Sequence, residues 1–262
     1  MARPGRPRLT VVALAVALVV LAGLGLSLAV SRGFGCTFAP AGTCVRVLFI
    51  GNSYTSVNDL PRVFARLAAS GGVSVEVAMI APGGASLAGH AADAGVSAAI
   101  AGGSGGVPWT AVVLQEQSEV PAVAQWRDTQ MAPAASALAR SVLMAGSRPY
   151  LLETWAHRDG LPSVGLDYPA MQTAISEAYR SIARQTGSGL VPAGDVWRRA
   201  LASGHAVALW ADDGSHPSLA GTYLAACSLY LALTGASPVG LSETAGLDPA
   251  VAAALRRIAA GE

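Results

Sequence analysis

Charged residues are scarce in this 262-residue chain, and lysine is missing altogether. The formal net charge is +1, and only 13% of the residues are charged. A protein that binds nucleic acid by electrostatic attraction needs a basic stripe, so the composition argues against that class. We attribute the use of arginine alone, together with abundant alanine and glycine, to codon bias in a GC-rich genome.

Cysteine is also scarce, and the common metal-binding motifs are absent. The chain has three cysteines, without a Cys-x-x-Cys pair or a His-Glu-x-x-His motif, so we expect no metal and no other cofactor. Cys36 and Cys44 bracket a turn-rich loop of suitable size for a disulfide in an oxidising compartment. Cys227 lies in an apolar helical run and is expected to be an inert core thiol.

An apolar run lies near the N-terminus. Residues 1–9 carry three arginines, and residues 10–30 carry no charge. Twenty-one helical residues would span ~31 Å, which matches a ~30 Å hydrocarbon core, whereas secretory signals usually have only ~7–15 apolar residues. We predict a basic cytoplasmic tail (1–9), an uncleaved transmembrane signal-anchor (10–30), an extracytoplasmic stem (31–44) and a domain (45–262) outside the cytoplasm. Secretion after cleavage at Ala29 is the alternative.

From Val45 onward, strand-like and helix-like patterns alternate, which indicates an α/β domain with a parallel sheet and helices on both faces. Residues 81–108 are rich in Gly, Ala and Ser and predict a loop with a short helix. Residues 217–233 are apolar enough to suggest a second membrane span, but their polar residues favour a buried packing helix. Strands are predicted at 45–50, 73–80, 110–114, 149–154 and 189–192, and further helices at 60–69, 131–145, 170–186, 196–203 and 249–260.

Two short motifs at opposite ends of the domain carry the chemistry. Gly51-Asn52-Ser53 follows the first predicted strand, and Asp213-Gly214-Ser215-His216 precedes an apolar helical run. Serine, imidazole and carboxylate are the groups that turn a hydroxyl into a nucleophile. An Asp three residues before a His can reach the ring Nδ1, which leaves Nε2 to face the serine. The motifs predict an ester hydrolase, although Gly51-Asn52-Ser53 alone could be an ordinary turn with a helix cap.

Together these motifs resemble those of the SGNH, or GDSL-type, hydrolase superfamily. Gly51-Asn52-Ser53 is similar to the first block, with Asn where Asp is usual, and Asp213 with His216 is similar to the last block. The resemblance implies that Ser53 is the nucleophile, His216 the general base and Asp213 its orienting carboxylate. It covers most of residues 45–235 and is strongest for a variant with Leu-Gln-x-x-Ser in the third block and Glu-Thr-Trp after a later strand.

The resemblance also implies an oxyanion hole. Its donors would be the backbone N–H groups of Ser53 and Gly84, with Gly83 as a rival to Gly84, and the side chain of Gln117. Gln117 stands where the superfamily normally has Asn. Its amide lies one methylene further out, so a small backbone adjustment could keep the NH2 group in range.

The remaining candidates are expected to be structural. His90 and His157 follow candidate active-site loops and could line the cleft, but structural or surface roles are favoured for them and for His205. Trp155 fits a cleft wall and a core equally well. Asp212 neighbours the expected carboxylate but has the wrong offset from His216.

We therefore predict a three-layer α/β/α sandwich with a parallel flavodoxin-like sheet, preceded by a transmembrane helix. The expected activity is hydrolysis of O-acyl groups on carbohydrate or envelope glycan, a substrate that rests on the resemblance. Expected partners are this substrate and the membrane, without nucleic acid. The alternatives are an O-acyltransferase that uses the same residues and a non-catalytic, membrane-tethered glycan-binding protein. A peptidase is disfavoured because nothing resembles a peptide subsite.

Overall fold

The computed structural model describes Cys36, residues 44–204 and residues 207–262. The predicted basic tail, signal-anchor, cleavage site and His205 lie outside these residues, as does most of the stem. Within the described part of the chain, every helix is too short or too polar to cross a membrane. The prediction of an N-terminal anchor therefore stays a prediction.

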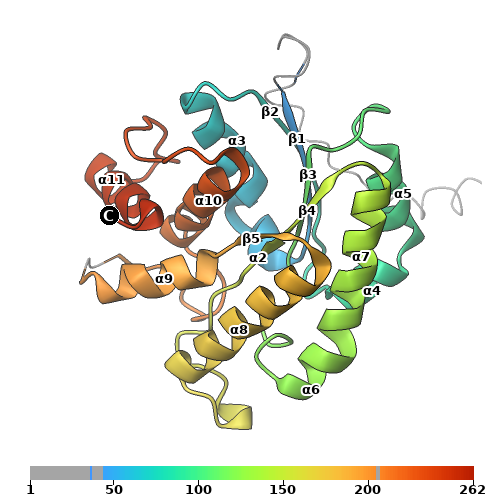
Figure 1. The fold of residues 1–262 in the computed structure, drawn as a ribbon. Helices are drawn as coiled ribbons and strands as arrows, with labels where there is room; N and C mark the ends of the chain where they lie inside the picture. The colour runs from blue at the N-terminus through green and yellow to red at the C-terminus, as the bar shows by residue number, and fades with distance from the viewer. Residues whose placement is uncertain (1–35, 37–43, 205–206) are drawn as a thin grey trace, which may run out of the picture.

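Five parallel strands form one sheet at the centre of the described domain (Figure 1). The sheet order is β2-β1-β3-β4-β5, which is the flavodoxin-like order. The strand order runs from β1 to β2 in one direction and from β1 to β3, β4 and β5 in the other. In open parallel sheets, ligands bind at the point where the order reverses, beyond the carboxyl ends of the strands. The strands are β1 (Val45–Ile50), β2 (Val75–Ile80), β3 (Ala111–Leu114), β4 (Arg148–Leu152) and β5 (Gly189–Val191).

Helices cover both faces of the sheet, as Figure 1 shows. One face packs against α3 (Leu60–Ser70), α9 (Ala193–Ala202), α10 (Leu219–Thr234) and α11 (Pro249–Ala260). The other face packs against α4 (Leu87–Ala92), α5 (Ala94–Gly102), α7 (Ala132–Met144) and α8 (Tyr168–Thr186). Short helical turns lie in the connections: α2 (Ser53–Ser56), η2 (Val57–Asp59), α6 (Ala124–Trp126), η3 (Arg127–Met131) and η4 (Pro162–Val164).

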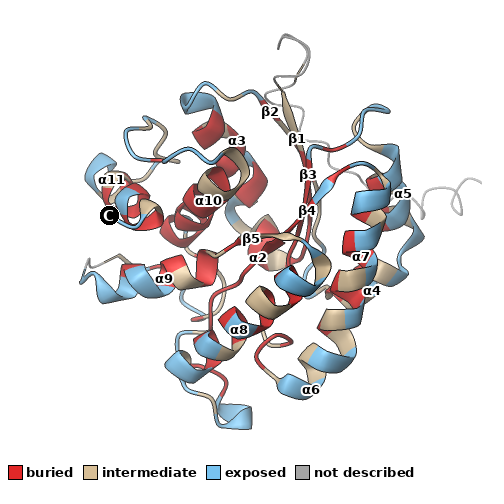
Figure 2. Ribbon diagram, in the orientation of Figure 1, coloured by how far each residue is buried: buried red, intermediate tan, exposed pale blue. Residues whose placement is uncertain are grey.

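The strands are largely apolar because each contributes to two hydrophobic cores. In β1, Val47 and Phe49 point into one core, whereas Leu48 and Ile50 point into the other. This follows from the alternation of side chains along a strand. Figure 2 shows the buried residues gathered between the sheet and its two helical layers. The predicted α/β sandwich with a parallel sheet is confirmed.

The segment 81–108 differs from the prediction of a loop with one short helix, because it forms both α4 and α5. Side-chain caps explain the two starts. Ser86 Oγ accepts a hydrogen bond from the Gly89 N–H, and Asp93 Oδ1 accepts one from the Gly95 N–H. The predicted helix at 131–145 is α7, and α6 and η3 precede it from Ala124 onward.

The helix α10 is a packing helix, as predicted for residues 217–233. All of its residues from Ala220 to Tyr230 are buried. Cys227 lies among them, and burial raises the pKa of its thiol to about 12. This agrees with the prediction of an inert core cysteine, since the thiolate is the reactive form.

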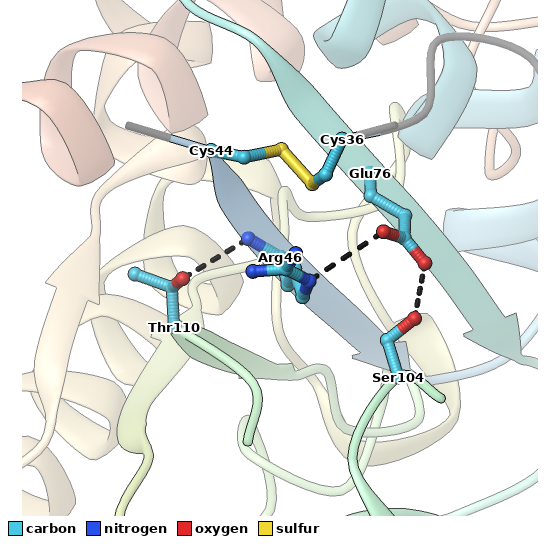
Figure 3. Close-up of a disulfide and its surroundings, with 6 residues drawn as sticks. All are labelled: Cys36, Cys44, Arg46, Glu76, Ser104 and Thr110. Atoms are coloured by element: carbon cyan, nitrogen blue, oxygen red, sulfur yellow. Dashed lines mark hydrogen bonds and ion pairs between the residues drawn. A yellow bond between two sulfur atoms is a disulfide. The ribbon is translucent and has the colours of Figure 1, made fainter. Parts of the chain in front are cut away.

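The predicted disulfide between Cys36 and Cys44 is present, with a Cα–Cα distance of 5.5 Å (Figure 3). Cys44 immediately precedes β1. Nearby, the Arg46 guanidinium pairs with the Glu76 carboxylate at 3.6 Å, and Glu76 also accepts a hydrogen bond from Ser104 Oγ. The bridge and this polar cluster therefore lie at the amino edge of the sheet, opposite the edge where ligands bind.

Candidate active site

The chain turns sharply at the carboxyl end of β1 and places Ser53 at the start of α2. Asn52 caps this helix, since its Oδ1 accepts a hydrogen bond from the Tyr54 N–H at 3.0 Å. Its Nδ2 donates to the Ala85 carbonyl oxygen at 2.9 Å. Asn52 therefore fixes the nucleophile turn and joins it to the Gly84-Ala85-Ser86 loop.

Gln115, which directly follows β3, hydrogen-bonds to the same turn. Its Oε1 accepts hydrogen bonds from the Asn52 N–H at 3.0 Å and from Thr55 Oγ1 at 2.8 Å. Its Nε2 donates to Asn52 Oδ1 at 2.9 Å. Sequence reasoning missed this role, although a polar residue directly after a buried apolar strand was a signal for it.

Gly51 lies against these side chains, which makes a testable prediction. A Cβ at Gly51 would lie 2.5 Å from Gln115 Oε1 and 2.6 Å from Thr55 Oγ1. We expect Gly51→Ala to lower the free energy of unfolding by about 1–3 kcal/mol, as overpacking of a filled site does. Gly89→Ala is the matched control, because a Cβ there would meet only Ser86 Oγ, at 3.7 Å. Equal urea midpoints for the two variants would contradict the packing argument.

The structure brings Ser53, His216 and Asp213 together. His216 Nε2 lies 2.9 Å from Ser53 Oγ, and His216 Nδ1 lies 2.6 Å from Asp213 Oδ2. Asp213 Oδ1 accepts hydrogen bonds from the backbone N–H groups of Ser215 and His216, both at 2.9 Å. The three-residue offset therefore gives the predicted contact, and the distances are those of a serine–histidine–carboxylate system.

Electrostatics fix the proton arrangement in this group. The hydrogen bond from the Ser215 N–H, followed by that from the His216 ring, lowers the pKa of Asp213 to about 2. The carboxylate is therefore ionised at neutral pH and requires a proton on His216 Nδ1. A neutral ring then has an unprotonated Nε2, which can accept the Ser53 hydroxyl proton. The neighbouring Asp212 has a different contact, since its backbone carbonyl oxygen accepts a hydrogen bond from the Arg158 guanidinium at 3.4 Å.

The loop that carries Asp213 and His216 is held by the segment after β4. The Trp155 indole N–H donates to the Ser215 carbonyl oxygen at 3.0 Å, and the Arg158 N–H donates to the Gly214 carbonyl oxygen at 2.7 Å. Gly214 has φ of +70°, a conformation that glycine adopts without a steric penalty.

Trp155 is a core residue and not a wall of the cleft. It is only 1% exposed. Its ring stacks between Tyr54 and Trp197, with centroid distances of 4.8 Å and 4.2 Å. This settles the choice that the sequence left open.

Asn58 connects the nucleophile segment to the histidine loop. Its Nδ2 donates to the Pro217 carbonyl oxygen at 3.1 Å and to Thr222 Oγ1 at 3.0 Å. Asn58 and Asp59 have φ of 58° and 53°, a region that asparagine and aspartate tolerate better than most residues. Two consecutive left-handed residues are costly, and such strain is commonly found next to functional groups.

Two of the three predicted oxyanion donors are backbone N–H groups, those of Ser53 and Gly84. Among the described residues, neither N–H donates a hydrogen bond to another protein group. Gly84 is exposed and has φ of +70°. The bond from Asn52 to Ala85 holds this loop beside the nucleophile turn.

The side chain of Gln117, the third predicted donor, has a fixed orientation. Its Oε1 accepts hydrogen bonds from the backbone N–H groups of Glu119 and Val120, at 2.8 and 3.1 Å. Its Nε2 has one long contact, with Ser118 Oγ at 3.5 Å. The carbonyl oxygen is thus engaged with the loop while the NH2 group retains hydrogen-bonding capacity.

Buried Glu116 joins the loops that carry these donors. Its Oε1 accepts hydrogen bonds from the Leu87 N–H at 3.0 Å and the Gln117 N–H at 2.7 Å. Burial raises the pKa of this carboxyl group. Sequence reasoning did not single out Glu116, since its two partners come from different parts of the chain.

His90 and His157 have different environments. His90 is buried, and its Nε2 donates to the Gly51 carbonyl oxygen at 2.7 Å, so it has the predicted structural role. His157 is half-buried, and its Nε2 lies 3.0 Å from Ser118 Oγ.

Comparison with known proteins identifies relatives of this fold. No protein-family model and no curated protein matches the sequence. Among solved structures, a protein of Slackia heliotrinireducens that is assigned to the SGNH hydrolases is 32% identical, with a TM-score of 0.62, and the match covers 72% of this chain and 99% of that protein.

Two further structures share the fold at lower identity. A DUF4886 family protein of Bacteroides uniformis is 20% identical, with a TM-score of 0.69, over 83% of this chain and 94% of its own. A lipase/acylhydrolase of Enterococcus faecalis is 13% identical, with a TM-score of 0.53, over 73% of this chain and 96% of its own. These two structures therefore share the fold of this chain over 73–83% of its length.

Proposed function

Because this chain belongs to the SGNH hydrolase superfamily, we propose that it is a serine acylhydrolase that cleaves esters through Ser53, His216 and Asp213. The observation that carries the proposal is the continuous hydrogen-bonded series from Ser53 Oγ through the His216 ring to Asp213, with contacts of 2.9 and 2.6 Å.

The reaction would proceed in two stages. His216 Nε2 takes the proton of Ser53 Oγ as this oxygen attacks the ester carbonyl carbon, and Asp213 stabilises the imidazolium ion. The imidazolium then protonates the departing alcohol oxygen, which leaves an acyl group on Ser53. In the second stage His216 takes a proton from water as the water oxygen attacks the acyl carbon. The imidazolium then returns this proton to Ser53 Oγ as the bond between Ser53 and the acyl group breaks, and the carboxylic acid is released.

The N–H groups of Ser53 and Gly84 and the amide of Gln117 would bind the oxyanion. We expect Gln117→Glu to lower kcat by about 10²–10³, because it replaces a donor with a second acceptor. The variant keeps an oxygen for the Glu119 and Val120 N–H groups, so its stability should change little. Gln125→Ala, which removes an exposed amide on α6, is the control. If the kcat of Gln117→Glu equals that of the control, Gln117 is not part of the oxyanion hole.

The proposed substrates are O-acyl groups on carbohydrate or envelope glycan, hydrolysed outside the cytoplasm by an enzyme that residues 10–30 hold in the cell membrane. The Cys36–Cys44 disulfide supports this location, since disulfides persist mainly in oxidising compartments. The uncharged run at 10–30 supports the membrane anchor.

Release of acetate from a monoacetylated methyl glucoside by the purified chain tests the proposal. We expect release without any added acceptor alcohol. Acetyl transfer that occurs only with an acceptor sugar would instead identify an O-acyltransferase. Glycan binding that survives Ser53→Ala, with no turnover of any ester, would identify a non-catalytic binding protein.

A further inference from the structure

A second serine–histidine pair lies on the loops that follow β3 and β4. Ser118 Oγ and His157 Nε2 are 3.0 Å apart. Ser118 is buried and His157 is half-buried. Neither residue has a role in the acyl-transfer steps described above, and neither belongs to a hydrophobic core.

Tyr54 connects this pair to the reacting groups. This residue follows Ser53 directly, and its hydroxyl shares a hydrogen bond of 2.6 Å with Ser215 Oγ. Burial raises the pKa of the Tyr54 hydroxyl to about 12, while the nearby hydroxyl groups of Ser215 and Ser118 lower it. The Tyr54 ring lies edge-on to the His216 ring, with centroids 5.6 Å apart. The Ser118–His157 pair therefore lies close to the reacting groups, because Ser118 acts on Tyr54 and the charges of Asp213 and His216 act on His157.

The charged groups around His157 include Asp213 and His216 of the candidate active site. Its burial is the main cause that lowers its pKa below the ordinary value of histidine, while the nearby carboxylates of Glu119 and Asp213 raise the pKa and His216 lowers it. The ring is consequently neutral at neutral pH. It then has one nitrogen that donates and one that accepts, and the Ser118 hydroxyl can also do both.

A subsite that both donates and accepts hydrogen bonds matches a hydroxyl group. It does not match the hydrocarbon part of an acyl chain, which would leave these polar atoms without partners. The alcohol part of an ester is therefore the part of the substrate that suits the pair. An ester of a simple alkyl alcohol has no free hydroxyl that could hydrogen-bond to Ser118 and His157. A partial ester of a sugar or of glycerol has such a hydroxyl.

We propose that Ser118 and His157 form a subsite that binds a free hydroxyl group on the alcohol part of the ester. The subsite makes the chain selective for partial esters of polyols. This inference rests on the proposed function, because it assigns the alcohol side of the same reaction.

Selectivity among three acetates tests the subsite. We expect His157→Ala to raise KM for a monoacetylated methyl glucoside about fivefold to tenfold, the usual effect of one lost hydrogen bond. The KM for cyclohexyl acetate, which has no free hydroxyl, should stay within about twofold. His157→Gln should recover part of the loss, since an amide can both donate and accept. Glycerol monoacetate tests whether the preferred alcohol part is glycerol or a sugar. The acetate, of glycerol or of the glucoside, whose KM rises more in His157→Ala identifies the preferred polyol.

The control variant is Asp159→Ala, which changes an exposed side chain two residues further along the same loop. Equal losses for the glucoside and cyclohexyl acetates in His157→Ala would show that His157 only supports the loop, and would overturn the subsite. An unchanged KM for both polyol acetates would overturn it as well. If the unaltered chain hydrolyses none of the three acetates, the proposed function fails and the subsite fails with it.

Discussion

Replacement of Ser53 by Ala is expected to lower kcat for ester hydrolysis by about 10⁵, since loss of the nucleophile in a serine hydrolase removes nearly all of its catalytic advantage. The Ser53 hydroxyl is the group that His216 Nε2 contacts at 2.9 Å. The helix start should survive, because Asn52 and not Ser53 caps it. The unfolding midpoint in urea should therefore stay near that of the unaltered chain.

Ser56→Ala is the matched control for this variant. Ser56 lies in the same short helix, and its side chain caps nothing. Its kcat should stay within about twofold of the unaltered chain, as most substitutions away from a site do. A Ser53→Ala variant that keeps the activity of Ser56→Ala would remove Ser53 from the reaction.

The second large effect is expected for Asp213→Asn, with kcat lowered by about 10³–10⁴. An amide in place of the carboxylate no longer favours the Nδ1–H tautomer and does not stabilise the imidazolium ion. The pKa of Asp213 is lowered to about 2, so this carboxylate stays ionised from neutral pH down to about pH 3. Loss of kcat/KM between about pH 7 and 4 should therefore not arise from protonation of Asp213.

The same pKa shift predicts how Asp213 affects stability. Its folded-state pKa lies below the ordinary value, so its contribution to stability is present above pH ~4 and is lost as the pH falls toward ~2.

Asp212→Asn is the control for the kcat loss in Asp213→Asn, because this adjacent carboxylate has the wrong offset from the histidine. A larger kcat loss in Asp212→Asn than in Asp213→Asn would reverse the assignment.

The parts of the fold that depend on local patterns were predictable from the sequence. Strand β1 and helix α11 have the predicted bounds, because each is a clear apolar or amphipathic pattern between strong turn signals. Asp213 and His216 are close in the sequence, so a single turn determines their contact. The prediction of the superfamily is confirmed by the 32% identical protein that is assigned to the SGNH hydrolases. The outer motifs lie on connections that the parallel topology brings to one edge of the sheet.

Long-range side-chain contacts were not predictable in the same way. Gln115 contacts Asn52 across 63 positions, and Asn58 contacts Pro217 across 159. Such pairs depend on register and on rotamers that only the packed structure determines. From the sequence, Trp155 was equally consistent with a cleft wall and with a core position. In the structure Tyr54 and Trp197 stack on the two faces of its ring, which places it in the core.

The most direct test of the central claim is to treat the full chain with a fluorophosphonate and to locate the adduct by mass spectrometry. This reagent bonds covalently to an activated serine, and the assignment of Ser53 and His216 predicts one adduct, on Ser53, that is lost in His216→Ala. An adduct on Ser118 or Ser215 instead, or equal labelling of Ser53 with and without His216, would contradict it.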